Sequence, residues 1–274
     1  MDVGFIGIGN MGSAIIEGII NAEIPVSLYT YDIDNTKAEK IPNISATICD
    51  DAREVVSICK YVFLCVKPQV MEGLLSDIEM HVSDDTVIVS IAAGISGHFI
   101  QKRLRDGIKV IQVMPNTPLM LGEGATALSS FAPTTKEEFD FVKNIFDAIG
   151  IAEEVPNEKM NEIIAVNGSS PAFIYLFAKG FLEYAANSGL DRDTALRLFS
   201  QSLIGSAKML TDSGYSVDEL ITMVSSPGGT TIAGLDSFYD SGFTSSIVNA
   251  CNACLRRADE LSPKPFVPKR EEDF

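Results

Sequence analysis

The sequence predicts a doubly wound α/β domain, built on a mostly parallel sheet of the Rossmann type, followed by an all-helical domain. Three observations lead to this prediction. Short, continuously apolar runs alternate with helix-like stretches over residues 1–156, a pattern typical of parallel strands buried on both faces. A glycine-rich turn follows the first of these runs, and the strand signals stop beyond residue 156, which favours a helical second domain.

The first domain alternates strands and helices in chain order. Strands are expected at residues 3–8, 26–31, 61–66, 87–91, 109–113 and 125–129, and helices at 11–21, 50–57, 69–77 and 97–105. Ligands of open parallel sheets bind at the carboxyl ends of the strands. The loops that follow the strands are therefore the expected binding surface.

The second domain is expected to span residues 157–262, with residues 263–274, rich in proline and charge, as a mobile tail. Two helix starts are well marked: Asp191 is a capping residue, and Ser216 with Glu219 forms a capping box. Apolar residues at helical spacing predict helices at 160–166, 172–188, 193–212, 217–224, 232–239 and 246–261. Residues 163–166, 172–181 and 196–210 are apolar on more than one face, which predicts an obligate homodimer.

Charge and composition narrow the class of partner. The 274-residue chain has 21 Lys and Arg against 37 Asp and Glu, a net charge of −16, which disfavours nucleic acid and anionic membranes as partners. No apolar run approaches the roughly 18 residues of a membrane span, and the start does not resemble a signal peptide. With five scattered cysteines, we expect a cytoplasmic protein with a small-molecule substrate.

Cys251 and Cys254 form a C-x-x-C inside a helix-like run. A redox pair usually begins a helix, and a zinc site needs more ligands than lie nearby. We interpret the two as small side chains on one helix face and predict no metal site.

The glycine-rich turn has the spacing G-x-G-x-x-G at Gly7, Gly9 and Gly12. It follows an apolar strand and opens a helix, so the first glycine permits the turn, the second admits a pyrophosphate, and the third allows helix and strand to pack closely. We therefore predict a dinucleotide-binding loop that includes Asn10 and Met11. A plain strand-to-helix turn is the alternative.

Asp32 ends the second expected strand, about 20 residues beyond the last glycine, where an acid can bind a ribose 2′-hydroxyl. This position favours NAD(H), because a 2′-phosphate would meet the carboxylate unless a cation intervened. Lys37 and Lys40 are near in sequence, though either could point elsewhere. A helix cap or loop acid is the alternative reading of Asp32.

Three further loops follow strands of the first domain and are predicted to face the cofactor. They are Val66, Lys67 and Pro68; Ala92, Ala93 and Gly94; and Met114, Pro115 and Asn116. The last belongs to a rigid loop, VMPNTP, which has hydrogen-bonding groups suited to holding a nicotinamide or its substrate.

The segment SSPGGTTIAGL at residues 225–235 contains the break between two expected helices, 217–224 and 232–239. Its proline stops one helix, its glycines expose the backbone, and its threonines open the next helix. Exposed N–H groups at a helix start bind carboxylates. We predict a carboxylate site formed by Ser226, Gly228, Gly229, Thr230 and Thr231, with a structural helix–helix turn as the alternative.

Together, VMPNTP at 113–118, GEGATAL at 122–128 and SPGGTTIAGL at 226–235 resemble the Δ1-pyrroline-5-carboxylate reductase family. The resemblance implies NADPH or NADH as cofactor, the substrate carboxylate at the SPGG segment, and Thr231 in contact with the ring nitrogen. It also implies a homodimer, and in several members a pentamer of dimers. Ser170 and Phe173 depart from the family's usual GSGPAY segment. Asp32, an acid that favours NAD(H), also differs from what the family's common preference for NADPH would lead one to expect.

The sequence does not single out one proton donor. Glu123 is an acid beside the nicotinamide-side loop that could protonate the imine or brace the loop, and solvent could also supply the proton. His81 and His98 are the only histidines, and neither is a candidate.

Two other functions compete with the reductase. A β-hydroxyacid dehydrogenase would carry a catalytic lysine in the helix that opens at residues 167–173, where none occurs, and Lys179 lies farther along. A non-catalytic dinucleotide sensor would have no evident need for a carboxylate pocket.

Overall fold

The structure is a computed structural model, which describes residues 1–41 and 46–261. The chain forms two compact units: residues 1–169 together with the chain from Ala253 on, and residues 170–252. The tail predicted at residues 263–274 lies outside the described residues.

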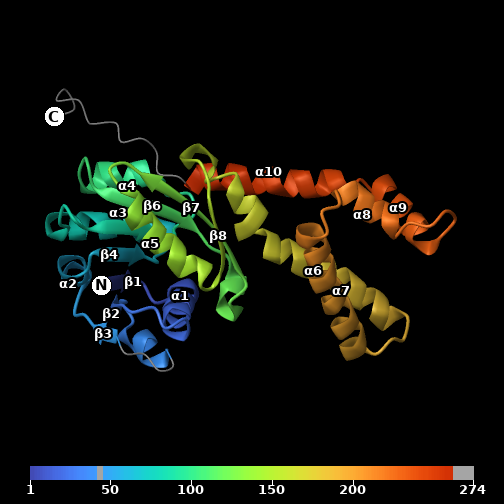
Figure 1. Cartoon of the computed structure of the whole chain (residues 1–274), viewed down its shortest axis with the longest axis horizontal. Helices are drawn as coiled ribbons and strands as arrows, with labels where there is room; N and C mark the ends of the chain where they lie inside the picture. Colours follow the sequence, from blue (N-terminus) through green and yellow to red (C-terminus); the bar gives the residue numbers. More distant parts are fainter. Residues whose placement is uncertain (42–45, 262–274) are drawn as a thin grey trace. The chain divides into compact units, whose positions relative to one another are not determined.

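The first unit is built on one sheet with the strand order β3-β2-β1-β4-β5-β6-β7-β8 (Figure 1). All neighbouring strands are parallel except β6 and β7, which confirms the mostly parallel, doubly wound prediction. The strands are β1 (Asp2–Ile6), β2 (Ser27–Tyr31), β3 (Ala46–Ile48), β4 (Tyr61–Leu64), β5 (Val87–Ser90), β6 (Lys109–Met114), β7 (Gly124–Phe131) and β8 (Gly150–Glu154).

Helices cover both faces of this sheet. Helices α1 (Asn10–Asn21) and α5 (Lys136–Asp147) share one buried cluster with Val3 and Phe5 of β1. On the other face, Ile6 packs with α2 (Ala52–Ile58), α3 (Pro68–Ile78) and α4 (Gly97–Leu104). Alternate side chains of one strand therefore enter two separate cores, which explains the continuously apolar strand sequences.

Among the described residues, two edge strands and one α-helix differ from the prediction by being additional to it. Strand β3 has three residues, and β8 ends in two exposed glutamates. Such short or polar strands at the edge of a sheet lack a continuous apolar run. Helix α5 was also missed, although Thr135 and Glu138 form a capping box at its start.

The helix predicted at residues 160–166 takes another form. A short 3₁₀ helix, η4, occupies Asn157–Lys159, and a π-helix, η5, occupies Ile164–Gly168. The N–H of Ser169 donates to the carbonyl of Ile164 at 2.8 Å, an i+5 bond that apolar spacing cannot distinguish from an α-helical one. Both elements pack within the first unit, while a domain division at residue 156 stays a prediction.

The second unit is helical. Its helices are α6 (Ser170–Asn187), α7 (Arg192–Asp212), α8 (Val217–Met223), α9 (Thr230–Asp240) and the first residues of α10 (Phe243–Leu261). The two predicted helix starts are confirmed: the Asp191 carboxylate accepts from the N–H of Thr194 at 2.8 Å, and Ser216 and Glu219 form a capping box.

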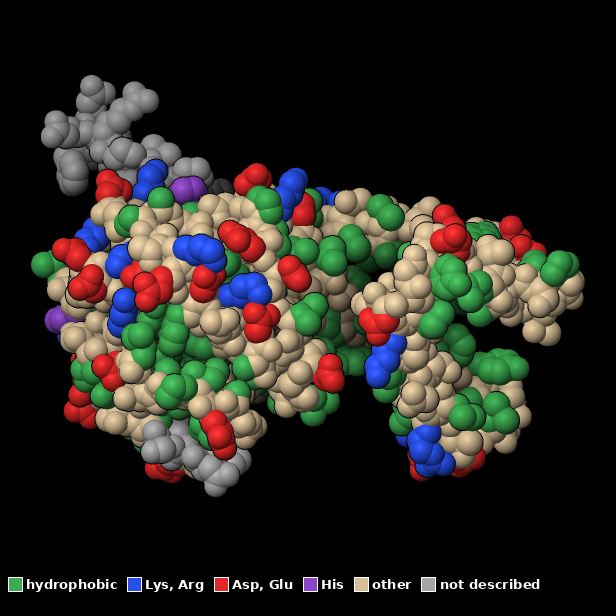
Figure 2. Space-filling view, in the orientation of Figure 1, with side chains coloured by type: hydrophobic (Ala, Val, Ile, Leu, Met, Phe, Trp, Pro, Cys, Tyr) green, Lys and Arg blue, Asp and Glu red, His purple; other side chains and the backbone are tan. Residues whose placement is uncertain are grey.

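Few side chains of this second unit are buried. Among described residues 170–252, only Pro171 and Ala185 are buried. Five phenylalanine rings of this unit contact one another: Phe177, Phe181, Phe199, Phe238 and Phe243. This aromatic cluster is still partly accessible to solvent, because Phe181 is 43% exposed. Figure 2 shows apolar side chains distributed over these helices.

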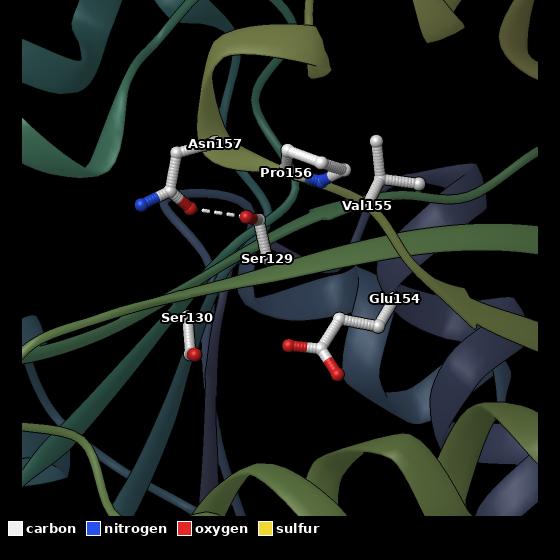
Figure 3. Close-up of a pocket in the computed structure, with 6 residues that line it drawn as sticks. All are labelled: Ser129, Ser130, Glu154, Val155, Pro156 and Asn157. Atoms are coloured by element: carbon white, nitrogen blue, oxygen red, sulfur yellow. Dashed lines mark hydrogen bonds between the residues drawn. The ribbon is translucent and has the colours of Figure 1, made fainter.

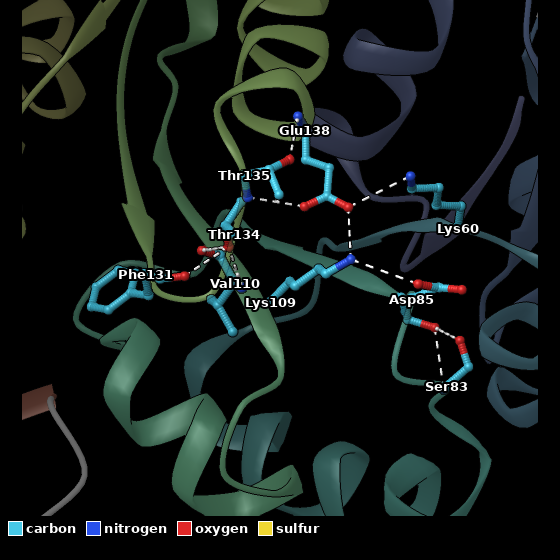
Figure 4. A network of polar contacts seen from close by, with 10 residues as sticks. Lys60, Ser83, Asp85, Lys109, Val110, Phe131, Thr134, Thr135 and Glu138 are labelled. Atoms are coloured by element: carbon cyan, nitrogen blue, oxygen red, sulfur yellow. Dashed lines mark hydrogen bonds and ion pairs between the residues drawn. The ribbon is translucent and has the colours of Figure 1, made fainter.

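A charged network lies at the amino-terminal ends of the central strands (Figure 4). The ammonium of Lys109, the first residue of β6, is 2.8 Å from the carboxylate of buried Glu138, and that of Lys60, just before β4, is 3.5 Å from it. Burial by itself raises the pKa of Glu138, but hydrogen bonds from Lys109 and from Thr135 outweigh it and hold that pKa below its usual value. The network therefore lies at the opposite end of the strands from the glycine-rich turn, which follows the carboxyl end of β1.

Candidate active site

The glycine-rich turn lies where the strand order of the sheet reverses. Strand β1 pairs with β2 on one side and with β4 on the other, so the chain winds outward in both directions from this point. In open α/β sheets a crevice forms beyond the carboxyl ends of the strands at such a switch point, and ligands bind there. The segments that follow β1 and β4 stand at this switch point.

Backbone geometry supports a pyrophosphate-binding turn. Gly7 has a φ of 97°, and a Cβ there would stand 2.8 Å from the carbonyl oxygen of Cys65. A Cβ on Gly12 would stand 2.4 Å from the carbonyl oxygen of Gly7, whereas one on Gly9 would meet nothing within 4 Å. Two glycines thus permit close packing, and the third leaves open space at the helix start.

Helix α1 begins at Asn10, and no side chain caps it: its N-cap residue is Gly9. The first N–H groups of an α-helix have no partner within the helix, and the helix dipole favours an anion beside them. The turn therefore fits the pyrophosphate of a dinucleotide, with the backbone of Asn10, Met11 and Gly12 nearest to it.

Asp32 directly follows β2, and its side chain turns back to the glycine-rich turn. Its Oδ2 accepts from the N–H of Ile8 at 2.6 Å, and its Oδ1 accepts from the N–H of Asp34 at 2.9 Å. The ammonium of Lys37 lies 2.9 Å from Oδ1 and 3.2 Å from Oδ2. Lys37 therefore points to the acid, while the side chain of Lys40 lies outside the described part of the structure.

Burial by itself raises the pKa of the Asp32 carboxyl. The N–H groups of Asp34 and Ile8 and the ammonium of Lys37 outweigh this effect, so the pKa lies below its usual value. Asp32 is 7% exposed, and it is ionised at neutral pH. That Asp32 favours NAD(H) stays a prediction.

The other cofactor loops follow β4 and β5. Lys67 is exposed and is the N-cap residue of α3, with Pro68 in the first turn. Ala92 is buried, and Gly94 has a φ of 75°. These loops follow the carboxyl ends of the two strands next to β1 on one side of the switch point. Contact of these residues with a cofactor stays a prediction.

Asn116 holds the loop after β6 in place. Its Oδ1 accepts from the N–H of Ala125 at 2.9 Å, and its Nδ2 donates to the carbonyl of Asn167 at 3.2 Å. Asn167, in the π-helix η5, donates from its own Nδ2 to the carbonyls of Met114 at 2.7 Å and Ala125 at 3.0 Å. The two amides join β6, β7 and η5 into one support for the predicted nicotinamide loop.

Glu123 is exposed between the 3₁₀ helix η3 (Thr117–Leu121) and β7, and its N–H donates to the carbonyl of Pro118 at 3.2 Å. The preceding Gly122 has a φ of 74°. The tight turn presents the carboxylate to solvent, so a role as proton donor stays a prediction.

The SPGG segment connects α8 and α9 within the second unit. Gly228 has a φ of 70°, and a Cβ on Gly229 would stand 2.9 Å from the carbonyl oxygen of Ser226. Gly229 is the N-cap residue of α9, and no side chain caps this helix. Thr230 and Thr231 occupy its first turn and are exposed. The segment therefore offers uncapped N–H groups beside two hydroxyls, as a carboxylate site requires.

One open pocket lies apart from all of these residues. It has a volume of about 420 Å³ and is lined by Ser129, Ser130, Glu154, Val155, Pro156 and Asn157 (Figure 3). The hydroxyl of Ser129 donates to the side chain of Asn157. No residue that the sequence predicts for the cofactor or the substrate lines this pocket, so we do not assign it to either.

We assign no histidine or cysteine side chain a role in the candidate site, although Cys65 packs against the glycine-rich turn. His98 makes an edge contact with Phe131 at 4.9 Å between ring centres. All five cysteines are free, and burial raises the pKa of Cys59 to about 12. Within residues 1–41 and 46–261, no group of three or more His, Cys, Asp or Glu residues is placed to hold a metal ion.

Two residues of the site were not identified from sequence. In the sequence, Asn167 stands only at the start of an expected helix, and nothing in its neighbourhood signals a contact with a loop 51 residues earlier. Lys37 was considered, but its direction depends on the 3₁₀ helix η1 (Asn35–Lys40). The Asp34 cap of that helix, which accepts from the N–H of Thr36, is the signal that could have indicated a turn back toward Asp32.

Comparison with known proteins identifies both parts of the chain. Residues 157–261 match the family model for pyrroline-5-carboxylate reductase dimerisation. Residues 2–94 match the model for NADP oxidoreductase, coenzyme F420-dependent. Within the described residues, no helix is both long and apolar enough to cross a bilayer.

Relatives of known name extend over nearly the whole chain. The pyrroline-5-carboxylate reductase of Escherichia coli is 34% identical over 263 residues, covering 95% of this chain and 98% of the relative. The crystal structure of Plasmodium falciparum pyrroline carboxylate reductase with NADP bound has a TM-score of 0.87 at 28% identity, covering 96% of this chain and 98% of that one. The Streptococcus pyogenes reductase has a TM-score of 0.88 at 28% identity, covering 95% and 98%. The chain belongs to the pyrroline-5-carboxylate reductase family of NAD(P)H-dependent oxidoreductases.

Proposed function

We propose that this protein reduces Δ1-pyrroline-5-carboxylate to L-proline with NAD(P)H, the last step of proline biosynthesis. The observation that carries the proposal is the presence of two separate helix starts without a side-chain cap in a chain of this family. One opens α1 after a G-x-G-x-x-G turn, and the other opens α9 after the SPGG break. The first suits a pyrophosphate, and the second suits the carboxylate of the substrate.

The cofactor residues divide by the part that they hold. The turn at Gly7, Gly9 and Gly12 binds the pyrophosphate, and Asp32 adjoins the adenosine ribose. The loops at 66–68, 92–94 and 114–116 hold the nicotinamide half. When bound, the reduced nicotinamide supplies the hydride. The contribution of this chain is mostly orientation, because a correctly held pair of reactants needs little further catalysis.

The substrate residues act on charge. The uncapped N–H groups at the start of α9, beginning with Thr230, bind the carboxylate. Gly228 and Gly229 form the turn before them without side chains, and Ser226 adds a hydroxyl donor. Thr231 places its hydroxyl at the ring nitrogen. This nitrogen carries the positive charge of the protonated imine before hydride transfer, and it keeps its proton as an amine afterwards. The protonated imine is the more electrophilic form. The substrate therefore either binds already protonated or takes up its proton from solvent in the site. Glu123 is the one side chain that we propose as an alternative donor.

The competing functions are separated by particular residues. A β-hydroxyacid dehydrogenase requires a lysine on the helix after the first domain, but Lys179 is exposed and lies 3.6 Å from Glu183 on its own helix. A dinucleotide sensor requires no carboxylate site, so it would not account for the uncapped start of α9.

One assay distinguishes these functions. Pyrroline-5-carboxylate should cause steady oxidation of NADPH or NADH, with proline as the product. A hydroxyacid dehydrogenase would instead reduce NAD(P)⁺ with a 3-hydroxy acid, and a sensor would bind the cofactor without turnover. Absence of proline formation with both cofactors would refute the reductase assignment.

The assembly follows from the open face of the second unit. The homodimer covers this face, in line with the dimerisation family matched by residues 157–261. We propose further that dimers assemble into a pentamer of dimers and that the enzyme works in the cytoplasm, where its free thiols remain reduced. Light scattering measures the first, and fractionation of cells the second.

A further inference from the structure

The ion pair between Asp32 and Lys37 stands at the point where NAD and NADP differ. An acid that follows the second strand of this fold adjoins the adenosine ribose, whose 2′-substituent is a hydroxyl in one cofactor and a phosphate in the other. Asp32 has that place here, and its bond from the N–H of Ile8 ties it to the glycine-rich turn.

The acceptor capacity of this carboxylate is already used. A carboxylate has about four lone-pair positions. Two are taken by the N–H groups of Ile8 and Asp34, and two by the ammonium of Lys37, which contacts both oxygens. A ribose hydroxyl can therefore donate to Asp32 only if Lys37 withdraws.

Lys37 is more accessible than its partner. Its side chain is 38% exposed, whereas that of Asp32 is 6% exposed. An ammonium has three N–H donors, so one remains beyond the two that Asp32 accepts. Asp32 supplies one negative charge and Lys37 one positive charge, and the pair presents no net repulsion to an entering phosphate.

We propose that Lys37 determines cofactor specificity: it neutralises Asp32 and donates to the 2′-phosphate of NADPH, so an acidic position of the NAD type accepts both cofactors. The inference rests on the proposed function only in taking the turn at Gly7–Gly12 as the dinucleotide site. With NADH, Lys37 moves aside and Asp32 accepts from the ribose hydroxyl. With NADPH, Lys37 stays between the two anions.

The test measures binding rather than turnover. Dissociation constants of NADPH and NADH are measured by nicotinamide fluorescence for the full chain and for Lys37→Gln. The amide of glutamine can still donate to Asp32 but has no charge. We expect the NADPH dissociation constant to rise tenfold or more and that of NADH to stay within threefold. Lys37→Arg should keep NADPH binding within threefold, because guanidinium binds phosphate well.

Lys136→Gln is the matched control. It removes the same charge from an exposed lysine of α5 that pairs with Asp140, and it should leave both constants unchanged. The proposal is overturned if Lys37→Gln weakens both cofactors by the same factor, if it leaves NADPH binding unchanged, or if the wild-type chain binds NADH alone.

A second measurement holds even if Lys37→Gln does not fold. Salt weakens the contact of an ammonium with a phosphate. Raising the salt concentration should therefore weaken the binding of 2′,5′-ADP to the wild-type chain more than that of 5′-AMP, and equal responses would overturn the proposal. Failure of the reductase assay with intact NADPH binding would refute the proposed function and leave the role of Lys37 standing.

Discussion

In the first unit, Phe5, Phe63 and Val89 are each 0% exposed, whereas in the second unit Leu176 and Leu198 are 68% and 67% exposed. The sheet of the first unit has helices on both faces, and each face closes a core of its own. The helices of the second unit meet through a cluster of phenylalanine rings and leave their remaining apolar surface open. The comparison teaches that the first unit is a complete globular fold, while the second requires a partner surface.

The largest expected effect tests this requirement directly. Leu176→Asp should raise the dissociation constant of the dimer a thousandfold or more, or about 4 kcal/mol, because a carboxylate would be buried without a partner. Analytical ultracentrifugation over a range of concentrations measures it. Met80→Asp is the control, since Met80 is 88% exposed in the first unit. If both variants remained equally dimeric, the open face would not be the interface.

The second prediction concerns a charge that the first unit buries successfully. Glu138→Gln should lower the free energy of unfolding by about 3 kcal/mol, because it leaves the ammonium of Lys109 without its buried counter-ion. Urea unfolding measures the loss. Glu137→Gln changes the exposed neighbour and should cost less than about 1 kcal/mol.

The same pair of variants has a predicted pH dependence. The folded-state pKa of Glu138 lies below its ordinary value of 4.5. Its ionisation therefore contributes stability above that ordinary value, and the contribution disappears as the pH falls through the folded-state pKa. The difference between wild type and Glu138→Gln should shrink between about pH 7 and about pH 3. A difference that grew on acidification would contradict the assignment.

The third prediction separates activity from stability in the second unit. Thr231→Ala should lower kcat/KM roughly five- to 150-fold, which corresponds to about 1–3 kcal/mol of lost transition-state stabilisation, through the lost hydroxyl contact to the ring nitrogen. Thr231 is exposed, so thermal unfolding should be unchanged. Thr222→Ala removes a hydroxyl that bonds the Asp218 carbonyl within α8 at 2.9 Å and should leave kcat/KM unaltered. Wild-type kinetics in Thr231→Ala would remove this residue from the proposed site.

The smallest expected effect concerns the support of the first-unit site. Asn167→Ala should lower the free energy of unfolding by about 1–2 kcal/mol, because two carbonyls lose the donor that joins β6 and β7 to η5. Asn161→Ala is the control, since the amide of Asn161 makes an exposed bond to Asp259. Equal stability of the two variants in urea would show that the amide bridge adds nothing to the first unit.

The central strands and the capped helices could be predicted from sequence, because their signals are local. An apolar run such as that of β5 indicates a buried strand wherever it lies, and the Ser216 capping box indicates a helix start by itself. Strand β8 could not be predicted: three of its five residues are glycine or glutamate, and its pairing with β7 supplies what its composition lacks.

The residues of the candidate site also fall into those with a local sequence signal and those without one. The glycines of the first turn and the SPGG break are local patterns with a mechanical reason, so they could be recognised. The bridge from Asn167 to Asn116 depends on how distant segments meet, and the direction of Lys37 depends on the irregular turn that separates it from Asp32. A side chain that turns back onto a residue five positions earlier gives no periodic signal.

The exposed apolar surface of the second unit also has a consequence for the rate of folding. A unit that buries its apolar surface only against another copy completes folding in a bimolecular step, so its rate rises with protein concentration. The first unit, with its own cores, folds in a step that is independent of concentration. A newly made chain therefore carries a finished nucleotide-binding domain while its helices still await a second chain, and the rate of synthesis sets how long those helices stay exposed to aggregation or to chaperones.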